Sequence, residues 1–340
     1  SQFGRIQDYA FLEGLTNLTS LNIHFNRRTT VDSIPFRSLS NLTSLNASFN
    51  KIKDLSYLNN LKKLTHLNLF NCTIKSNFDY LQFFTTIEKL NLASCRLKLG
   101  SSSDYPTDVG FLNKLPKLTS LDLSLLNTIT NFNFLKSLSE LTYLALSTKR
   151  SDLNLLQGMK LTHLKLERCT LDDFSVLHSF QNLSSLNLSR SNIVDISFQQ
   201  NLTTLKSIDL SYCTDITDFN PLQNLVNLTS LNVSDTLIVD ANFMQNLTNL
   251  KKIDLSYCIH LTDIRSLHNL TNLTDLNLRV TKIVDISILK DLPKLAKLCL
   301  ERCEDIRNLS LILSFPNLQN VDIFDKDLLE ALKLKGIKFF

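Results

Sequence analysis

Leucines recur along almost the whole chain in the pattern L-x-x-L-x-L, followed three residues later by a small polar residue or a cysteine. Most copies lie 22 or 23 residues apart. Side chains alternate along a strand, so both leucines of L-x-L face one side. A strand this short cannot bury its face alone, which predicts parallel stacking of the copies. The fourteen copies begin at Leu18, Leu42, Leu64, Ile87, Leu118, Leu141, Leu161, Leu183, Leu205, Leu228, Leu250, Leu273, Leu295 and Leu318.

The segment between successive copies leaves only about ten residues for the return path, too few for a full α-helix and enough for a 3₁₀ turn. It often reads I-x-D-(I/F), and an aspartate there can accept nearby backbone N–H groups. The fold class expected is an α/β repeat solenoid, a horseshoe or arc. Its concave side is a parallel β-sheet of about 14 short strands, and its convex side holds 3₁₀, short helical and extended segments. The aspartates are Asp54, Asp195, Asp218, Asp240, Asp263 and Asp285.

The repeats predict one domain over residues 1–340. Residues 1–17 match the second half of a repeat, 18–326 hold the fourteen copies, and 327–340 leave the phase and read as a C-terminal cap with a helix and a final strand. An irregular insertion near 97–112 lengthens one spacing to 31 residues, and its glycine-rich part predicts a projecting loop. The copy at Leu141 is followed by only 20 residues and has Lys149 at its ninth position.

The ninth position of each copy holds six of the seven cysteines. We expect a buried ladder here, because small polar side chains can satisfy backbone groups where the strand turns away. Cysteines in alternate copies lie roughly 10 Å apart, beyond the ~7 Å that a disulfide allows. No C-x-x-C or Cys/His pair suggests a metal site. The ladder residues are Asn26, Asn50, Cys72, Cys95, Cys169, Cys213, Cys258 and Cys303, whereas Cys299 faces outward on the sheet.

These motifs resemble the leucine-rich repeat family, and the resemblance covers nearly the whole chain. The 22-residue period with I-x-D-I is most similar to the internalin-like and phosphatase-regulator-like class. The C-x-x-I-T-D wording of Cys213 to Asp218 is also similar to the cysteine-containing repeats of F-box substrate receptors. The resemblance implies a protein-binding module.

The third, fifth, seventh and eighth positions of each copy are expected on the concave face. The fifth is nearly always Asn or Asp, a regularity that indicates a structural stripe. Departures from it are candidates for partner contact, because exposed aromatic and arginine side chains commonly anchor interfaces. The alternatives are rings that fold over the sheet margin and charges that are simply solvated. The candidates are Phe25, Phe49, His66, Phe70, Tyr143, His163, Lys165, Glu167, Arg168, Arg190, Arg279, Glu301 and Arg302.

The composition excludes several other functions. A net charge of +4 from 36 basic and 32 acidic residues gives no basic surface for nucleic acid. No apolar run is long enough for membrane insertion. No catalytic motif, phosphate loop or metal-ligand spacing occurs, so we expect no enzyme activity, no cofactor, no metal and no small-molecule substrate. The remaining partner is a protein bound on the concave face.

Two cellular roles stay open as alternatives to a simple binding module. One is a regulatory or substrate-receptor subunit of an intracellular complex, and the other is a microbial adhesin or effector resembling internalins. Reduced ladder cysteines and the absence of a leader in this chain favour the cytoplasm, with a cell-surface or secreted microbial protein as the alternative.

Overall fold

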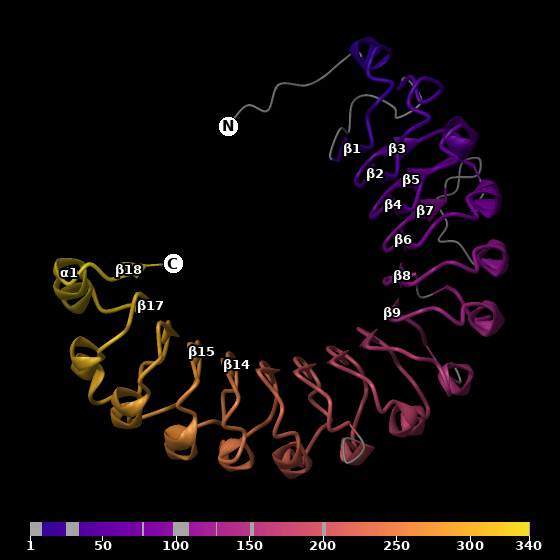
Figure 1. Cartoon of the computed structure of the whole chain (residues 1–340). Helices are drawn as coiled ribbons and strands as arrows, with labels where there is room; N and C mark the ends of the chain where they lie inside the picture. Colours follow the sequence, from indigo (N-terminus) through magenta and orange to yellow (C-terminus); the bar gives the residue numbers. More distant parts are fainter. Residues whose placement is uncertain are drawn as a thin grey trace. The chain divides into compact units, whose positions relative to one another are not determined.

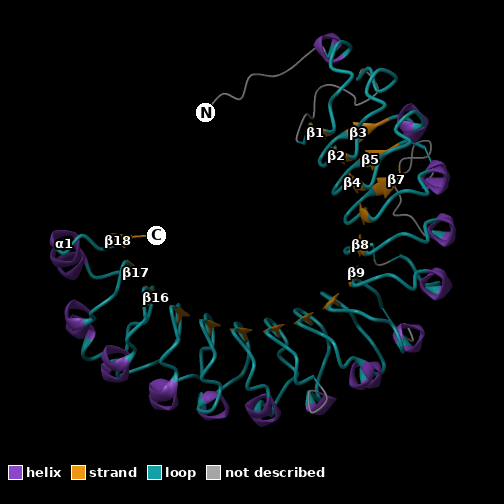
Figure 2. Ribbon diagram, in the orientation of Figure 1, coloured by secondary structure: helices purple, strands orange, loops and turns teal. Residues whose placement is uncertain are grey.

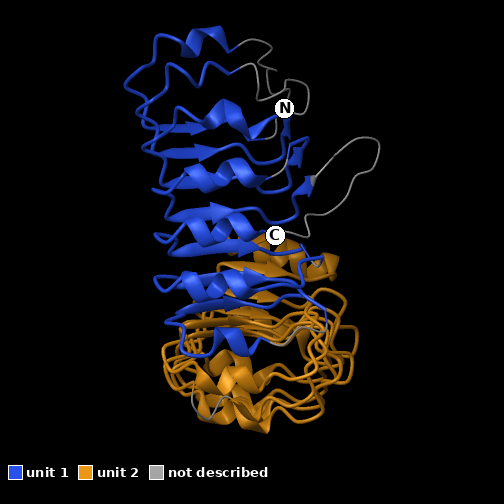
Figure 3. Ribbon diagram, turned by 90° about the vertical axis from the view of Figure 1, so that its right-hand side faces the viewer, with its two compact units in different colours: residues 1–167 blue, residues 168–340 orange. Residues whose placement is uncertain are grey.

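The computed structural model describes residues 9–24, 34–76, 78–97, 109–126, 128–149, 153–198 and 202–339. The chain forms two compact units, unit 1 (Ser1–Glu167) and unit 2 (Arg168–Phe340), shown in Figure 3. Both are built from the same repeating element, a short strand followed by a 3₁₀ helix (Figures 1 and 2). The expected repeat fold is therefore confirmed.

Unit 1 contains a parallel sheet whose neighbouring strands come from successive repeats. Its strand order is β1-β2-β4-β6-β8-β9-β10, with β1 (Ser20–Asn22), β2 (Ser44–Asn46), β4 (His66–Asn68), β6 (Lys89–Asn91), β8 (Ser120–Leu123), β9 (Tyr143–Leu146) and β10 (His163–Lys165). A second parallel sheet joins β3 (Lys51–Ile52), β5 (Thr73–Ile74) and β7 (Arg96–Leu97). The 3₁₀ helices are η1 (Ala10–Leu12), η3 (Leu55–Leu58), η4 (Phe78–Phe83), η5 (Gly110–Lys114), η6 (Asn133–Ser137) and η7 (Asn154–Leu156).

Unit 2 repeats this plan and ends in a different element. Its strands are β11 (Ser185–Asn187), β12 (Ser207–Asp209), β13 (Ser230–Asn232), β14 (Lys252–Asp254), β15 (Asp275–Asn277), β16 (Lys297–Cys299), β17 (Asn320–Asp322) and β18 (Lys338–Phe339). The 3₁₀ helices are η8 (Ser175–Ser179), η10 (Asn220–Asn224), η11 (Asn242–Met244), η12 (Arg265–Asn269), η13 (Ser287–Asp291) and η14 (Leu309–Ser314). The α-helix α1 (Lys326–Leu334) and β18 follow the last of these 3₁₀ helices.

The leucines of the pattern form the core between the strands and the 3₁₀ helices. In the repeat that begins at Leu228, the residues Leu228, Leu231 and Val233 are each at most 1% exposed. The strand pairing holds equivalent residues in register, so that Leu231 lies between Ile208 and Ile253. Burying one such side chain contributes roughly 1.5–3 kcal/mol. Every repeat therefore depends on its neighbours for its share of the core.

The aspartates of the return segments begin the 3₁₀ helices, as predicted. The carboxylate of Asp54 accepts from the backbone N–H of Ser56 at 2.9 Å. In unit 2, Asp195, Asp218, Asp240, Asp263 and Asp285 make the same contact with the residue two positions on, at 2.8–2.9 Å. These carboxylates thus satisfy backbone donors at the start of each turn.

The eighth residue of the repeats adopts the left-handed conformation. This holds for Phe49, Asn71, Ser94, Leu125, Arg168, Arg190, Tyr212, Asp235, Tyr257, Val280 and Arg302, whose φ angles lie between 53° and 63°. The N–H of this residue still donates to the next repeat, as from Tyr212 to the carbonyl of Ser234 at 2.9 Å. The backbone then turns sharply, which directs the ninth side chain into the core.

One repeat buries its eighth residue in place of its ninth. In the repeat that begins at Leu141, Lys149 is exposed and Thr148 is fully buried. Thr148 does not share the positive φ of the other eighth residues. This repeat therefore turns one residue earlier, because burying a lysine ammonium would be far more costly than burying a threonine hydroxyl.

Candidate functional site

The ladder cysteines are buried hydrogen-bond donors. Five of the six ladder thiols donate to the carbonyl at the sixth position of the preceding repeat, as from Cys72 to Ala47 at 3.1 Å and from Cys95 to Leu69 at 3.0 Å. Cys213, Cys258 and Cys303 make the equivalent bond at 2.9–3.3 Å. Cys169 and Asn50 are buried in the same column, and Asn26 lies outside the described residues. All seven cysteines are free thiols.

Burial also makes these thiols poor nucleophiles. It raises the pKa of the Cys72 thiol to about 12 and that of Cys95 well above its ordinary value. The outward-facing Cys299 is only partly buried, yet burial raises its pKa to about 11. Since the thiolate is the reactive form, none of these three cysteines suits catalysis at neutral pH.

Where threonine and cysteine alternate in the ladder, the two side chains share one backbone carbonyl. Thr236 donates its hydroxyl to the carbonyl of Val233 in its own repeat at 2.6 Å. Cys258, in the next repeat, donates to the same carbonyl at 3.3 Å. In the same way, the carbonyl of Leu278 accepts hydrogen bonds from the hydroxyl of Thr281 at 2.8 Å and from the thiol of Cys303 at 2.9 Å. Each alternating pair therefore converges on one carbonyl, which accepts with both of its lone pairs.

The fifth-position stripe is structural. Its side chain accepts the N–H of the seventh residue in the same repeat, as from Ser48 to Asn46 at 3.1 Å and from Ser211 to Asp209 at 2.9 Å. Neighbouring amides and carboxylates also pair, since Asn187 donates to Asp209 at 3.1 Å. The same seventh-residue contact occurs at Asn22, Asn68, Asn91, Asp122, Asn187, Asn232, Asp254 and Asn277.

Two adjacent repeats of unit 1 abandon this contact. Their fifth residues are Ala145 and Lys165, which carry no side-chain acceptor. The ammonium of Lys165 instead pairs with Glu167 at 2.8 Å. Burial lowers the pKa of Lys165, but the hydrogen bond and charge of Glu167 outweigh this and raise it above its ordinary value. Tyr143 and His163 face each other on the paired strands β9 and β10, two residues before Ala145 and Lys165, and their ring centroids are 6.3 Å apart.

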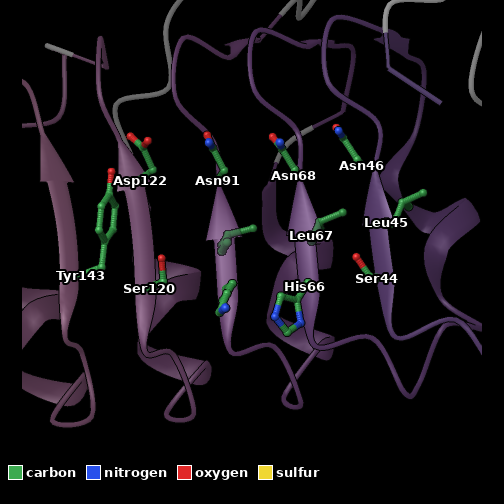
Figure 4. Close-up of a pocket in the computed structure, with 12 residues that line it drawn as sticks. Ser44, Leu45, Asn46, His66, Leu67, Asn68, Asn91, Ser120, Asp122 and Tyr143 are labelled. Carbon is green, nitrogen blue, oxygen red and sulfur yellow. The ribbon is translucent and has the colours of Figure 1, made fainter. Parts of the chain in front are cut away.

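A polar hollow lies on the strand face of unit 1 (Figure 4). Its volume is about 390 Å³, and it opens over strands β2, β4, β6, β8 and β9. His66 and Tyr143 line it, together with Lys89 and Asp122, which the sequence pattern did not single out. Partial burial and the charge of Asp122 raise the pKa of Tyr143, although Lys165 acts in the opposite direction. The side chains that line the hollow include both hydrogen-bond donors and hydrogen-bond acceptors.

The other sequence candidates fall into separate groups. Phe49 and Phe70 pack edge to face with centroids 5.0 Å apart, half-buried on the same unit. Phe25 lies outside the described residues. In unit 2, Arg279 and Arg302 pair with Glu301. Arg168 and Arg190 are exposed at the eighth position, and the guanidinium of Arg190 lies 3.6 Å from the ring centroid of Tyr212.

Within the described ranges, no group of three or more His, Cys, Asp or Glu side chains is arranged to hold a metal ion. None of the helices in that part of the chain has the length and apolar character needed to cross a bilayer.

Comparisons with known proteins agree with this architecture. Residues 16–74 match the family model described as leucine rich repeat. No match to the chain was found among the curated proteins. The fold is that of a leucine-rich repeat protein. An internalin, InlF of Listeria monocytogenes, is 26% identical with a TM-score of 0.67, and the alignment covers 96% of this chain and 88% of that one.

Two other solved structures share the fold. The functional domain of InlJ from Listeria monocytogenes, which includes a cysteine ladder, is 23% identical with a TM-score of 0.61, covering 92% of this chain and 70% of that one. The ectodomain of the plant receptor kinase GASSHO1/SCHENGEN3 from Arabidopsis thaliana, in complex with CASPARIAN STRIP INTEGRITY FACTOR 2, is 17% identical with a TM-score of 0.52, covering 97% of this chain and 47% of that one. Leucine-rich repeat folds commonly serve as protein-interaction modules, and this chain has that fold.

Proposed function

We propose that this protein is a non-enzymatic module that binds a protein partner on its strand face. The observation that carries the proposal is the loss of the structural stripe at Ala145 and Lys165. Elsewhere in unit 1 the fifth position serves the backbone, as Asn91 and Asp122 do. A lysine there contributes nothing to that contact and presents a cation that is about one-third exposed. Such a departure is expected where a surface is shaped for a ligand.

The surroundings of Lys165 support a protein ligand. Tyr143 and His163 offer ring surface, and Lys165 with Glu167 offers one charge of each sign. Aromatic side chains with a nearby salt bridge give both anchoring area and orientation at interfaces. The hollow that contains Tyr143 continues this surface across five strands. It is open and polar, which suits a protein surface better than an enclosed small-molecule site.

The test is the exchange Lys165→Asn, which restores the residue type found at this position in most repeats. We expect the variant to lose most of its partner binding while keeping a thermal midpoint at least as high as that of the wild type. Affinity capture from lysates of the source organism and of host cells, followed by titration of the captured partner, measures the first effect. A melting curve followed by circular dichroism measures the second.

The matched control is Lys160→Asn, which removes the same charge from an exposed position outside the strand. It should bind the partner as the wild type does. If both variants lost partner binding equally, the loss would be explained by net charge alone, and the proposed surface would be rejected. Full binding by Lys165→Asn would also reject it.

For the cellular role, we infer an adhesin or effector similar to internalins in preference to a regulatory subunit. The likeness to InlF, which spans 96% of this chain, favours it. The test is binding of the purified protein to intact host cells, with Lys165→Asn as the negative control. Saturable binding that the variant lacks supports the role. Capture only of proteins from the organism's own cytoplasm would support the regulatory alternative.

A further inference from the structure

Two tyrosines of unit 2 occupy the same place in repeats that are two apart. Tyr212 and Tyr257 are both eighth residues with φ of 59° and 61°, and each is 39% exposed. The repeat between them carries Asp235 at the equivalent position, with φ of 55°. The strands β12, β13 and β14 pair in register. Backbone pairing continues to the eighth residue, from Tyr212 to Ser234 at 2.9 Å and from Asp235 to Ser256 at 2.8 Å.

Arginines approach the two rings from opposite directions. Arg190, in the repeat before Tyr212, places its guanidinium 3.6 Å from the centroid of that ring. Arg279, in the repeat after Tyr257, places its guanidinium 5.8 Å from the other ring. Each arginine therefore comes from the repeat on the far side of its tyrosine, away from the repeat that carries Asp235. Tyr212, Asp235 and Tyr257 thus follow one another at the eighth position of three paired repeats, and this row is called the tyrosine slot below.

The carboxylate of Asp235 makes no ion pair or side-chain hydrogen bond with any residue of the described part of the chain. It is half-buried. Other acidic residues of the strand face are engaged, such as Asp275 with Lys297 at 3.3 Å and Glu301 with Arg279. A half-buried carboxylate between two aromatic rings is thus poised to receive a positive charge from outside.

The spacing fits a cation. Two strand intervals of ~4.8 Å separate the two tyrosines by roughly 10 Å. A cation midway would lie about 5 Å from each ring, within the ~6 Å over which aromatic faces attract cations. A guanidinium is planar, stacks on aromatic faces and can donate two hydrogen bonds to one carboxylate. An ammonium offers the charge without the stacking.

We propose that the tyrosine slot binds an arginine side chain of a protein partner, with the guanidinium between Tyr212 and Tyr257 and bonded to Asp235. This rests on the proposed protein-binding function and names the chemistry of one contact within it. Arg190 and Arg279 hold the rings from outside, so that the slot is formed before the ligand arrives.

The experiment is a titration of the whole protein with acetyl-Gly-Arg-Gly-amide, followed by the amide NMR signals of Tyr212, Asp235 and Tyr257. We expect saturable shifts at these signals with the arginine peptide, at least about fivefold weaker binding with acetyl-Gly-Lys-Gly-amide, and none with acetyl-Gly-Glu-Gly-amide. Tyr212→Ala and Tyr257→Ala should each weaken the arginine peptide about fivefold, and Asp235→Asn about tenfold.

Matched controls separate the slot from general effects. Tyr57→Ala removes a tyrosine that is 45% exposed on unit 1, and Asp215→Asn removes an exposed carboxylate near Tyr212 in sequence. Both should bind the arginine peptide as the wild type does. No saturable shift in the wild type, or equal binding by the slot variants and the wild type, would overturn the proposal. A lysine peptide that binds as tightly as the arginine peptide would overturn the assignment to a guanidinium.

The outcome for the slot is distinguishable from that for the strand face. Lys165→Asn lies outside the slot and should leave peptide binding unchanged. If the peptide fails to bind while Lys165→Asn still loses the partner, the slot is rejected and the proposed function stands. If the peptide binds while Lys165→Asn keeps the partner, the slot stands and the strand-face site near Lys165 is rejected.

Discussion

At the scale of single residues, the fold depends on small side chains that serve the backbone of a neighbouring repeat. Cys72 is an example, because its thiol donates to Ala47 and it is 1% exposed. The sequence pattern identified such positions, since small polar residues that recur once per repeat at a fixed distance from the leucines indicate a buried column. It did not show that Thr236 and Cys258 would share one carbonyl, because that depends on the direction in which each side chain points.

The raised pKa of Cys72 predicts a loss of stability at alkaline pH. Burial raises this pKa from 9.0 to about 12, so between these values the unfolded chain has lost a proton that the folded protein retains. The free energy of unfolding therefore falls as the pH rises through this window. Relative to neutral pH, the loss due to Cys72 should reach about 1.4 kcal/mol at pH 10.

Urea titrations at pH 7.5 and pH 10, with a reductant present, measure this loss in the wild type and in Cys72→Ser. The variant lacks this thiol, so it should lose less stability than the wild type by the stated amount. An identical loss in the two proteins would contradict the assignment to Cys72.

Val280 predicts a stabilising substitution. It holds a φ of 55°, a conformation that is strained for a β-branched side chain and tolerated by asparagine. Val280→Asn should therefore raise the free energy of unfolding by about 1 kcal/mol. Thermal or urea unfolding measures the change.

The control for this substitution is Val284→Asn, a similarly half-exposed valine that lacks the positive φ. It should gain no stability. A gain of equal size in both variants would mean that the benefit comes from removing exposed apolar surface.

At the scale of the element, the strand face depends on alternating amides and carboxylates. Asn187 and Asn277 donate to Asp209 and Asp254 across neighbouring strands, at 3.1 and 3.2 Å. The register places Asn232 between the two aspartates. The sequence pattern showed that Asn and Asp share this column, but only the paired strands show that a neutral amide separates two carboxylates.

The arrangement predicts that Asn232→Asp is destabilising. The new carboxylate keeps the acceptor for the N–H of Ser234 and gains a like charge on each side at ~4.8 Å. We expect a loss of about 1–2 kcal/mol at low salt that shrinks at high salt. The same exchange at Asn68, whose neighbours Asn46 and Asn91 are neutral, should cost much less. Equal costs at the two sites in denaturant titrations would refute the charge explanation.

At the scale of the whole molecule, the reactivity of each cysteine thiol measures whether the repeat that carries it is folded. All seven are free, and six are buried in the ladder. We expect the native protein at pH 8 to expose only Cys299 to a thiol reagent, slowly because its pKa is about 11. The unfolded protein should react at all seven. Rapid reaction of more than one thiol in the native state would show that a repeat opens in solution.

The sequence by itself determined the repeat, the inward leucines, the ladder and the 3₁₀ return segments. Each is a property of local spacing, and stacking identical units leaves no choice about which side is buried. The tertiary structure alone decided how neighbours across repeats meet. It moved the buried position from Lys149 to Thr148, lined the hollow of unit 1 with Lys89 and Asp122, and brought Arg190 and Arg279 against the rings of Tyr212 and Tyr257. These contacts depend on left-handed turns and side-chain directions, which the periodic pattern does not contain.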